Sequence, residues 1–247
     1  MYFINYVKDK KLFEEIAPNV YGLKRNGINF STRIYKYIDL SALIDIGNGN
    51  FKVQRRMDFS DRHESTVGML REFYSENDDE NYKKSDERNL NEILKKQSAE
   101  FLTTCFTKRS SELHAMWKAF TSGYTGVRIS TTIGQIVESM KLDGYNLYIG
   151  TVKYEKVVWR YDVVRDMFTK NPCYSPEKEL RIYILPKNGE LPKEAVNLKV
   201  DSEKLITGIT LSPFIPQPIH IPIRNMLSKR FPNANIQGST ISEKPIK

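Results

Sequence analysis

The segment YSPEKELRIYI, residues 174–184, places two glutamates at the start of an apolar run. Side chains of a β-strand alternate between its two faces, so Glu177, Glu179 and Arg181 are predicted to share one face. A like-charged pair beside a cation is typical of a solvated strand end, and also of a site that uses carboxylates. The segment alone leaves both interpretations open.

Hydrophobic periodicity along the rest of the chain predicts the other elements. Strands are expected over 29–40, 51–59, 99–106, 127–131, 145–157, 177–185 and 208–213. Helices are expected over 41–46, 110–126, 133–142, 159–170 and 221–231, with Ser110 or Ser111 as the cap of the second. Strands interspersed with short helices at uneven spacing predict an α+β fold with a mixed sheet.

The 247 residues suit one α+β domain over 1–232. An almost wholly polar or charged stretch at 75–92 is expected to be an exposed insertion. Residues 233–247 are polar and are expected to form a C-terminal tail, in which IQGSTI, residues 236–241, could add a short edge strand.

Composition excludes several classes of protein. Two Cys and three His give no zinc-type spacing, so no metal site is expected. Neither GxxxxGK(S/T) nor GxGxxG occurs, which argues against P-loop ATPases and Rossmann dehydrogenases. No secretory signal or membrane span is evident, so we expect a cytoplasmic protein without a membrane anchor. The net charge of +8 favours an anionic partner.

Three stretches resemble an uncharacterised bacterial domain family. They are IYKYID with NGNFKVQRRMDFSDRHE, then TTCFTKRSSELHAMWKAFTSGYTGVRIS, then TVKY with MFTKNPCYSPEKELRIYI. That family is marked by a Tyr-x-Tyr strand, a Phe-Asn-Asp-Pro-like turn, a Met-Trp-x-x-Tyr helix and a Glu-x-Glu-x-Arg strand. This chain departs from the pattern at FSDR, residues 59–62, and at Phe120, where the family's helix carries Tyr.

The order of these elements is also similar to the Arg, Ser-Thr-Ser, Glu-x-Glu plan of mono-ADP-ribosyltransferases. TRIYKY, TTCFTKRSS and EKELRIYI take the three places, with Thr107 as the closest counterpart of Ser-Thr-Ser. The resemblance implies an ADP-ribosyltransferase-like split sheet and NAD as a substrate. It also implies a toxin-like or phage-defence setting, in which an antitoxin-like partner would neutralise the activity.

Transfer from NAD breaks the bond between nicotinamide and ribose through an oxocarbenium-like transition state. On this resemblance, Glu179 would stabilise the positive charge, Glu177 would orient or deprotonate the acceptor, and Arg181 could keep both ionised. Nucleic acid is favoured over protein as the acceptor because the chain is basic.

The remaining predicted residues would bind the cofactor. Arg33 is the candidate for the pyrophosphate, with Arg55 and Arg56 as alternatives. Tyr35 and Tyr37 would offer an aromatic wall for nicotinamide, or else belong to the core. Thr107 would hydrogen-bond the ribose or brace Glu179, or else begin a helix cap.

Two other functions remain open. A non-catalytic module could bind nucleic acid or nucleotides with the same fold and basic surface. Asp58, Asp61, His63 and Glu64 would suit a metal-dependent nuclease, although the chain offers no second acidic cluster at a matching spacing.

Overall fold

The computed structural model describes residues 12–56, 101–122, 124–155, 167–188, 190 and 194–241. These residues form two compact units, each assembled from three segments of the chain. The first unit comprises Met1–Ile28, Val53–Thr104 and Gly144–Val196, and the second comprises Asn29–Lys52, Cys105–Asp143 and Asn197–Lys247. Three of the five boundaries between them fall inside strands β4, β5 and β11. The expected insertion at 75–92 lies outside the described residues.

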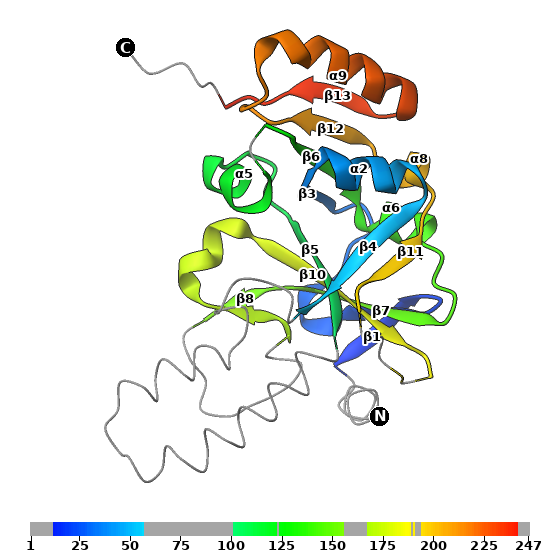
Figure 1. The fold of residues 1–247 in the computed structure, drawn as a ribbon. Helices are drawn as coiled ribbons and strands as arrows, with labels where there is room; N and C mark the ends of the chain where they lie inside the picture. The colour runs from blue at the N-terminus through cyan, green and yellow to red at the C-terminus, as the bar shows by residue number, and fades with distance from the viewer. Residues whose placement is uncertain are drawn as a thin grey trace. The chain divides into compact units, whose positions relative to one another are not determined.

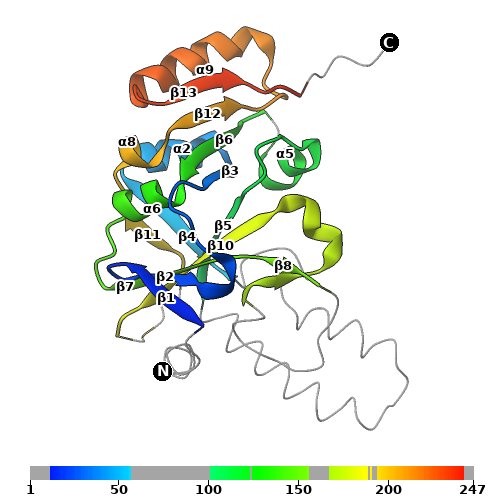
Figure 2. The same cartoon turned by 180° about the vertical axis from the view of Figure 1, so that it is seen from behind.

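The first unit is built on a mixed sheet whose strands follow the order β1-β2-β7-β10-β5. Its elements are β1 (Phe13–Ala17), β2 (Val20–Leu23), η1 (Lys24–Asn26), β5 (Leu102–Thr107, beginning here), β7 (Tyr145–Thr151), β8 (Lys153–Tyr154), β9 (Thr169–Lys170), η3 (Pro172–Glu177) and β10 (Glu179–Pro186). β2 runs parallel to β7, and β10 runs antiparallel to it. β8 and β9 form a separate parallel pair. Figure 2 shows β1 and β2 beside β7.

All eight residues of β10 are buried. A strand buried on both faces reads as a nearly continuous apolar run, as LRIYIL does here. Tyr183 of β10 packs with Phe101, Tyr148, Met167 and Phe168 in the core of this unit. The side chains of Glu179 and Arg181 are therefore held in a buried position.

The second unit has the strand order β5-β3-β6-β12-β13, and β11 pairs with β4 beside it. Its elements are β3 (Arg33–Asp39), α2 (Leu40–Gly47), β4 (Asn50–Arg55, beginning here), the end of β5, α5 (His114–Phe120), β6 (Gly126–Thr132), α6 (Ile133–Ser139), β11 (Val196–Lys199), α8 (Ser202–Leu205), β12 (Gly208–Leu211), α9 (Gln217–Arg230) and β13 (Asn235–Gly238). β3 and β12 are antiparallel to β6, whereas β13 is parallel to β12. α9 lies along β13 (Figure 1).

Local sequence explains several element ends in this unit. Thr132 and Gln135 form a capping box at the start of α6, because each side chain bonds the other residue's backbone N–H. Gly49 has a φ of 82° in the turn between α2 and β4, a conformation that glycine adopts without strain.

The expected mixed α+β character is confirmed, with parallel and antiparallel strands and short helices. The strands expected over 29–40, 127–131 and 208–213 and the helices over 41–46, 133–142 and 221–231 occur with shifted ends. β13 lies inside the expected polar tail, where the sequence suggested an edge strand. β1 and β2 were not expected.

Three local predictions are wrong. Helix α5 begins at His114 after Leu113, with no side-chain cap, so neither Ser110 nor Ser111 caps it. Leu113 is extended, and Glu112 before it is held by hydrogen bonds from Ser239 and Thr240.

The helix expected over 159–170 ends too late: Met167 is helical, but Thr169 and Lys170 form strand β9. The strand expected over 145–157 is interrupted at Val152. Its backbone N–H bonds the Glu179 carbonyl, and the next residue, Lys153, bonds the Phe168 carbonyl instead. The chain thus changes partner at that point.

Candidate functional site

The seven predicted site residues fall in the two units. Glu177, Glu179 and Arg181 lie in the first, and Arg33, Tyr35, Tyr37 and Thr107 lie in the second.

Glu179 and Arg181 form a buried ion pair at the start of β10. Arg181 Nε lies 2.9 Å from Glu179 Oε1, and Nη2 lies 3.3 Å from Oε2. Only 5% of Glu179 and 1% of Arg181 are exposed. The two residues are two positions apart on one strand, so the predicted common face is confirmed for this pair.

Glu177 does not belong to that strand, so its predicted place in the alternation is wrong. It ends the 3-10 helix η3, and Lys178 follows in the left-handed conformation with a φ of 46°. Pro176 has no backbone N–H to give to a strand ladder, which favours a turn at this point.

Lys170 nevertheless brings the two glutamates together. Its Nζ lies 3.1 Å from Glu177 Oε2 and 3.7 Å from Glu179 Oε2. The ammonium group also sits 4.3 Å from the centre of the Tyr174 ring, a cation–π distance. Two carboxylates and two cations thus form one cluster, which we call the Lys170 cluster: Lys170, Glu177, Glu179 and Arg181.

Neighbouring polar groups fix the Lys170 cluster in place. The Met167 carbonyl accepts hydrogen bonds from Arg181 Nη1 at 3.0 Å and from the Tyr183 hydroxyl at 2.9 Å. The backbone N–H of Glu179 donates to the Tyr154 hydroxyl at 2.8 Å. Burial raises the pKa of Tyr154, the Glu179 and Glu177 charges raise it further, and this phenol therefore stays neutral at physiological pH.

The predicted cofactor wall in the second unit has a different organisation from the one expected. Tyr37 is 6% exposed and packs edge-on against Trp117 at 4.8 Å, so its core interpretation is confirmed. Tyr35 is half-buried, and the guanidinium of Arg128 covers one face of its ring at 4.5 Å. Arg33 is exposed at the first position of β3. The Tyr35 face that meets Arg128 cannot also stack on nicotinamide.

Thr107 lies opposite Tyr35 in the pairing of β5 with β3. It is 2% exposed, and its Oγ1 accepts a hydrogen bond from the Arg109 N–H at 3.0 Å. This bond closes a local turn after the strand and does not cap a helix.

Sequence reasoning missed Lys170 and Arg128. Arg128 carries a recognisable signal, because a cation interrupts the apolar alternation of GVRIS in the middle of a strand. Lys170 offers no comparable signal, since its neighbours predict a helix.

The chain matches no protein-family model and no curated protein.

The described residues contain no helix of the length and apolar character that a bilayer crossing requires. Within the same residues, no group of three or more His, Cys, Asp or Glu side chains is arranged to hold a metal ion. Asp58, Asp61, His63 and Glu64, proposed for a nuclease, lie outside the described part of the chain.

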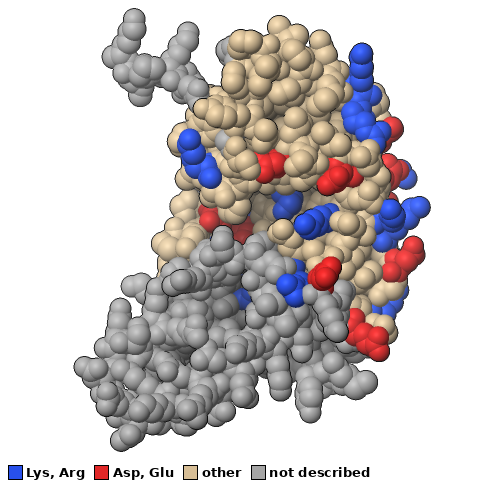
Figure 3. All heavy atoms as spheres, in the orientation of Figure 1, with Lys and Arg blue, Asp and Glu red and all other residues tan. Residues whose placement is uncertain are grey.

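Charge on the face drawn in Figure 3 is mixed. Lys and Arg side chains alternate with Asp and Glu among the described residues of that face, without one continuous basic area. The net charge of the chain therefore does not define a nucleic-acid surface on that face of the molecule.

Proposed function

We propose that this protein transfers ADP-ribose from NAD to a macromolecular acceptor, with an ADP-ribosyltransferase-like split sheet as its scaffold. The observation that carries the proposal is the pairing of β5 with both other motif strands. In the second unit Thr107 of β5 pairs with Tyr35 of β3, and in the first unit Thr103 Oγ1 donates to the Ile182 carbonyl of β10 at 3.2 Å. In each unit, the part of β5 that belongs to it therefore bonds one of the other two motif strands, and this supports the proposal.

Glu179 suits the role of electrostatic stabiliser. Its carboxylate is fixed by two hydrogen bonds from Arg181, so it need not reorganise as positive charge develops on the ribose. The adjacent cations favour its ionised form.

Glu177 suits the acceptor side of the reaction. It is the more exposed of the two carboxylates, with 18% of its side chain accessible against 6% for Glu179. Lys170 holds its Oε2 at 3.1 Å, and a carboxylate fixed in this way can accept the proton of an acceptor hydroxyl or amine. We propose nucleic acid as the acceptor because the chain is basic.

A second candidate is nucleotide or nucleic-acid binding without turnover. It is favoured over turnover by the Lys170 cluster, in which two carboxylates face two cations and Glu179 is almost fully buried. Carboxylates paired with cations in this way are also what a structural ion-pair network without a catalytic role would show.

The test uses NAD labelled in its adenosine part, mixed with total bacterial nucleic acid or with lysate protein. Transition-state stabilisers of this kind contribute roughly 10²–10³ in rate, so Glu179→Gln should lose the labelling by about that factor. Glu14→Gln, at an exposed position of β1 in the same unit, should label like the wild type. Circular dichroism and thermal unfolding establish that each variant is folded.

The outcomes separate the candidates. Label on the nucleic-acid fraction with the wild type, retained in EDTA, supports transfer and excludes a metal-dependent nuclease as its source. If folded wild-type protein neither labels any acceptor nor releases nicotinamide, the transferase proposal is overturned and binding without turnover remains. Equal labelling by Glu179→Gln and the wild type would show that Glu179 has no role in the reaction.

A further inference from the structure

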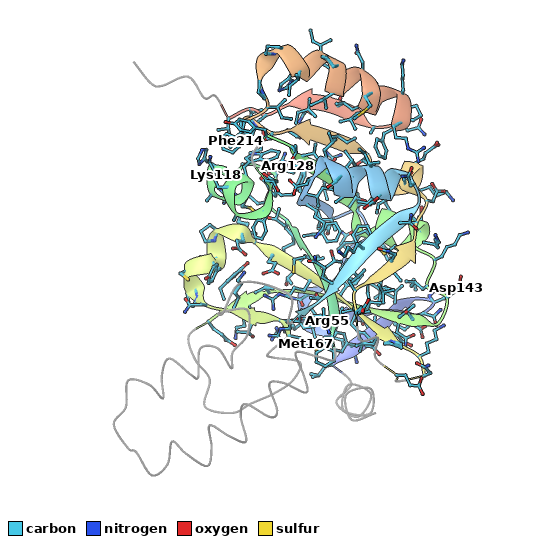
Figure 4. The ribbon with its side chains drawn as sticks, viewed as in Figure 1. Arg55, Lys118, Arg128, Asp143, Met167 and Phe214 are labelled. Atoms are coloured by element: carbon cyan, nitrogen blue, oxygen red, sulfur yellow. The ribbon has the colours of Figure 1, made fainter. Side chains whose placement is uncertain are left out.

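Arg128 is a buried cation in the middle of a sheet (Figure 4). It occupies the centre of β6, where it pairs with Tyr37 of β3 on one side and with Thr210 of β12 on the other. Its Nη1 donates to the Ser110 carbonyl at 2.9 Å, and its guanidinium lies 4.5 Å from the Tyr35 ring centre. Only 6% of the residue is exposed.

Within the part of the chain that the structure describes, the guanidinium does not use all of its donors. The group has five N–H donors, and a buried one without a partner costs free energy. Nε is buried and makes no hydrogen bond, and Nη1 donates to the Ser110 carbonyl. Burial raises the pKa of the Tyr37 hydroxyl, and the guanidinium also acts on this hydroxyl, lowering its pKa by less. A ligand would reach Arg128 through the 6% of the residue that stays exposed.

Glu112, a carboxylate on which the Arg128 charge acts, is committed elsewhere. Glu112 accepts hydrogen bonds from Trp117 Nε1 at 3.0 Å, Ser239 Oγ at 2.5 Å and Thr240 at 2.8 Å and 2.9 Å. Arg128 influences Glu112 through space, but the two form no ion pair in the described structure. Arg128 therefore has no paired carboxylate among the described residues, and its guanidinium can bind another anion.

We propose that Arg128 binds the phosphate of a nucleotide, with Tyr35 holding the guanidinium through its ring face. An Arg fork matches two phosphate oxygens, and a stacked guanidinium is already oriented for that contact. This assigns the phosphate contact to Arg128, a residue distinct from the exposed Arg33. The inference concerns binding alone, so it stands or fails separately from the transfer reaction.

The experiment is calorimetric titration of the full chain with ADP, inorganic pyrophosphate and adenosine. We expect ADP and pyrophosphate to bind the wild type and adenosine to bind far more weakly. Arg128→Gln should weaken ADP binding at least about tenfold. The affinity of Arg128→Lys for ADP should lie between those of the wild type and Arg128→Gln, because lysine keeps the charge and loses the two-pronged guanidinium. Lys118→Gln is the matched control, since it removes an exposed charge from α5 of the same unit.

A second variant covers the case in which Arg128→Gln does not fold. Tyr35→Leu keeps Arg128 and removes the ring beneath it, and should weaken ADP several-fold while the circular dichroism spectrum is unchanged. The proposal is overturned by a wild type that binds neither ADP nor pyrophosphate at millimolar concentration. It is equally overturned if adenosine binds as well as ADP, or if folded Arg128 and Tyr35 variants bind like the wild type.

Discussion

Arg181 donates hydrogen bonds to both carboxylate oxygens of Glu179 inside the first unit, from Nε to Oε1 at 2.9 Å and from Nη2 to Oε2 at 3.3 Å. Both side chains are nearly inaccessible to water. Removing one partner of a buried ion pair leaves the other charge uncompensated, at a cost of about 3–5 kcal/mol. Because Lys170 still lies 3.7 Å from Glu179 Oε2, part of that charge stays compensated, and we expect Arg181→Met to lower the free energy of unfolding by at most about 3–5 kcal/mol, measured by urea denaturation.

Lys153, the exposed partner of Glu155, provides the control for this prediction. Its side chain is 57% exposed against 18% for Glu155, and ion pairs that reach the solvent contribute about 0–1 kcal/mol. Lys153→Met should therefore change stability by less than about 1 kcal/mol. The double variant Glu179→Gln with Arg181→Met should cost less than the two single variants added together, and strict additivity would show that the pair is not coupled.

Gly150 is predicted to tolerate no side chain. It pairs with Arg181 across β7 and β10, and a Cβ at this position would lie 2.6 Å from Phe168 Cε1 and 2.7 Å from Cδ1. Phe168 is itself fully buried against Tyr183, so its ring cannot move freely. Gly150→Ala should cost about 1–3 kcal/mol of unfolding free energy, measured by urea denaturation.

Adding Phe168→Leu tests the cause of that loss. The smaller side chain makes room for the new methyl group, so Gly150→Ala should cost less in the Phe168→Leu background than in the wild type. An equal cost in both backgrounds would assign the effect to the backbone and not to the ring.

Local properties of the site could be predicted from the sequence, whereas its long-range contacts could not. Alternation along LRIYIL is enough to predict β10 and to place Glu179 and Arg181 on one face, because both properties are local. The turn at Lys178 places Glu177 outside that strand. Lys170, which lies on the separate strand β9, then forms an ion pair with Glu177. Long-range pairing of this kind has no local pattern, which is why the predicted carboxylates could be found and their partner could not.

Stability is predicted to depend on Glu112 at acidic pH. Burial by itself would raise the pKa of Glu112, but the hydrogen bonds from Ser239 and Thr240, together with the Arg128 charge, hold it below its ordinary value of 4.5. The unfolded chain thus binds this proton more readily than the folded one. The contribution of Glu112 is complete above about pH 4.5 and is lost as the pH falls through its lowered pKa in the folded protein.

Urea denaturation at a series of pH values measures this contribution. At neutral pH Glu112→Gln should be less stable than the wild type, and the gap should narrow with acidification. Ser239→Ala removes one of the donors and brings the folded-state pKa of Glu112 closer to its ordinary value, so the acid loss of this variant should be smaller and should end at a higher pH than in the wild type. A gap between wild type and Glu112→Gln that is the same at pH 7 and pH 3 would contradict the prediction.

The first unit should lose stability in alkali through Tyr148. This residue is 3% exposed and stacks on Tyr21 at 5.1 Å, and burial, followed by the Tyr21 charge, raises the pKa of Tyr148 to about 12. The folded protein therefore holds the phenol proton more tightly than the unfolded chain, whose tyrosines ionise near pH 10. The stabilising contribution is complete below pH 10 and is lost as the pH rises toward 12.

Tyr148→Phe keeps the ring without an ionisable group, so its unfolding free energy should fall less steeply than that of the wild type between pH 10 and 12. Its absorbance titration at 295 nm should lack one late-ionising tyrosine. Identical alkaline slopes for the variant and the wild type would show that another group controls unfolding in alkali.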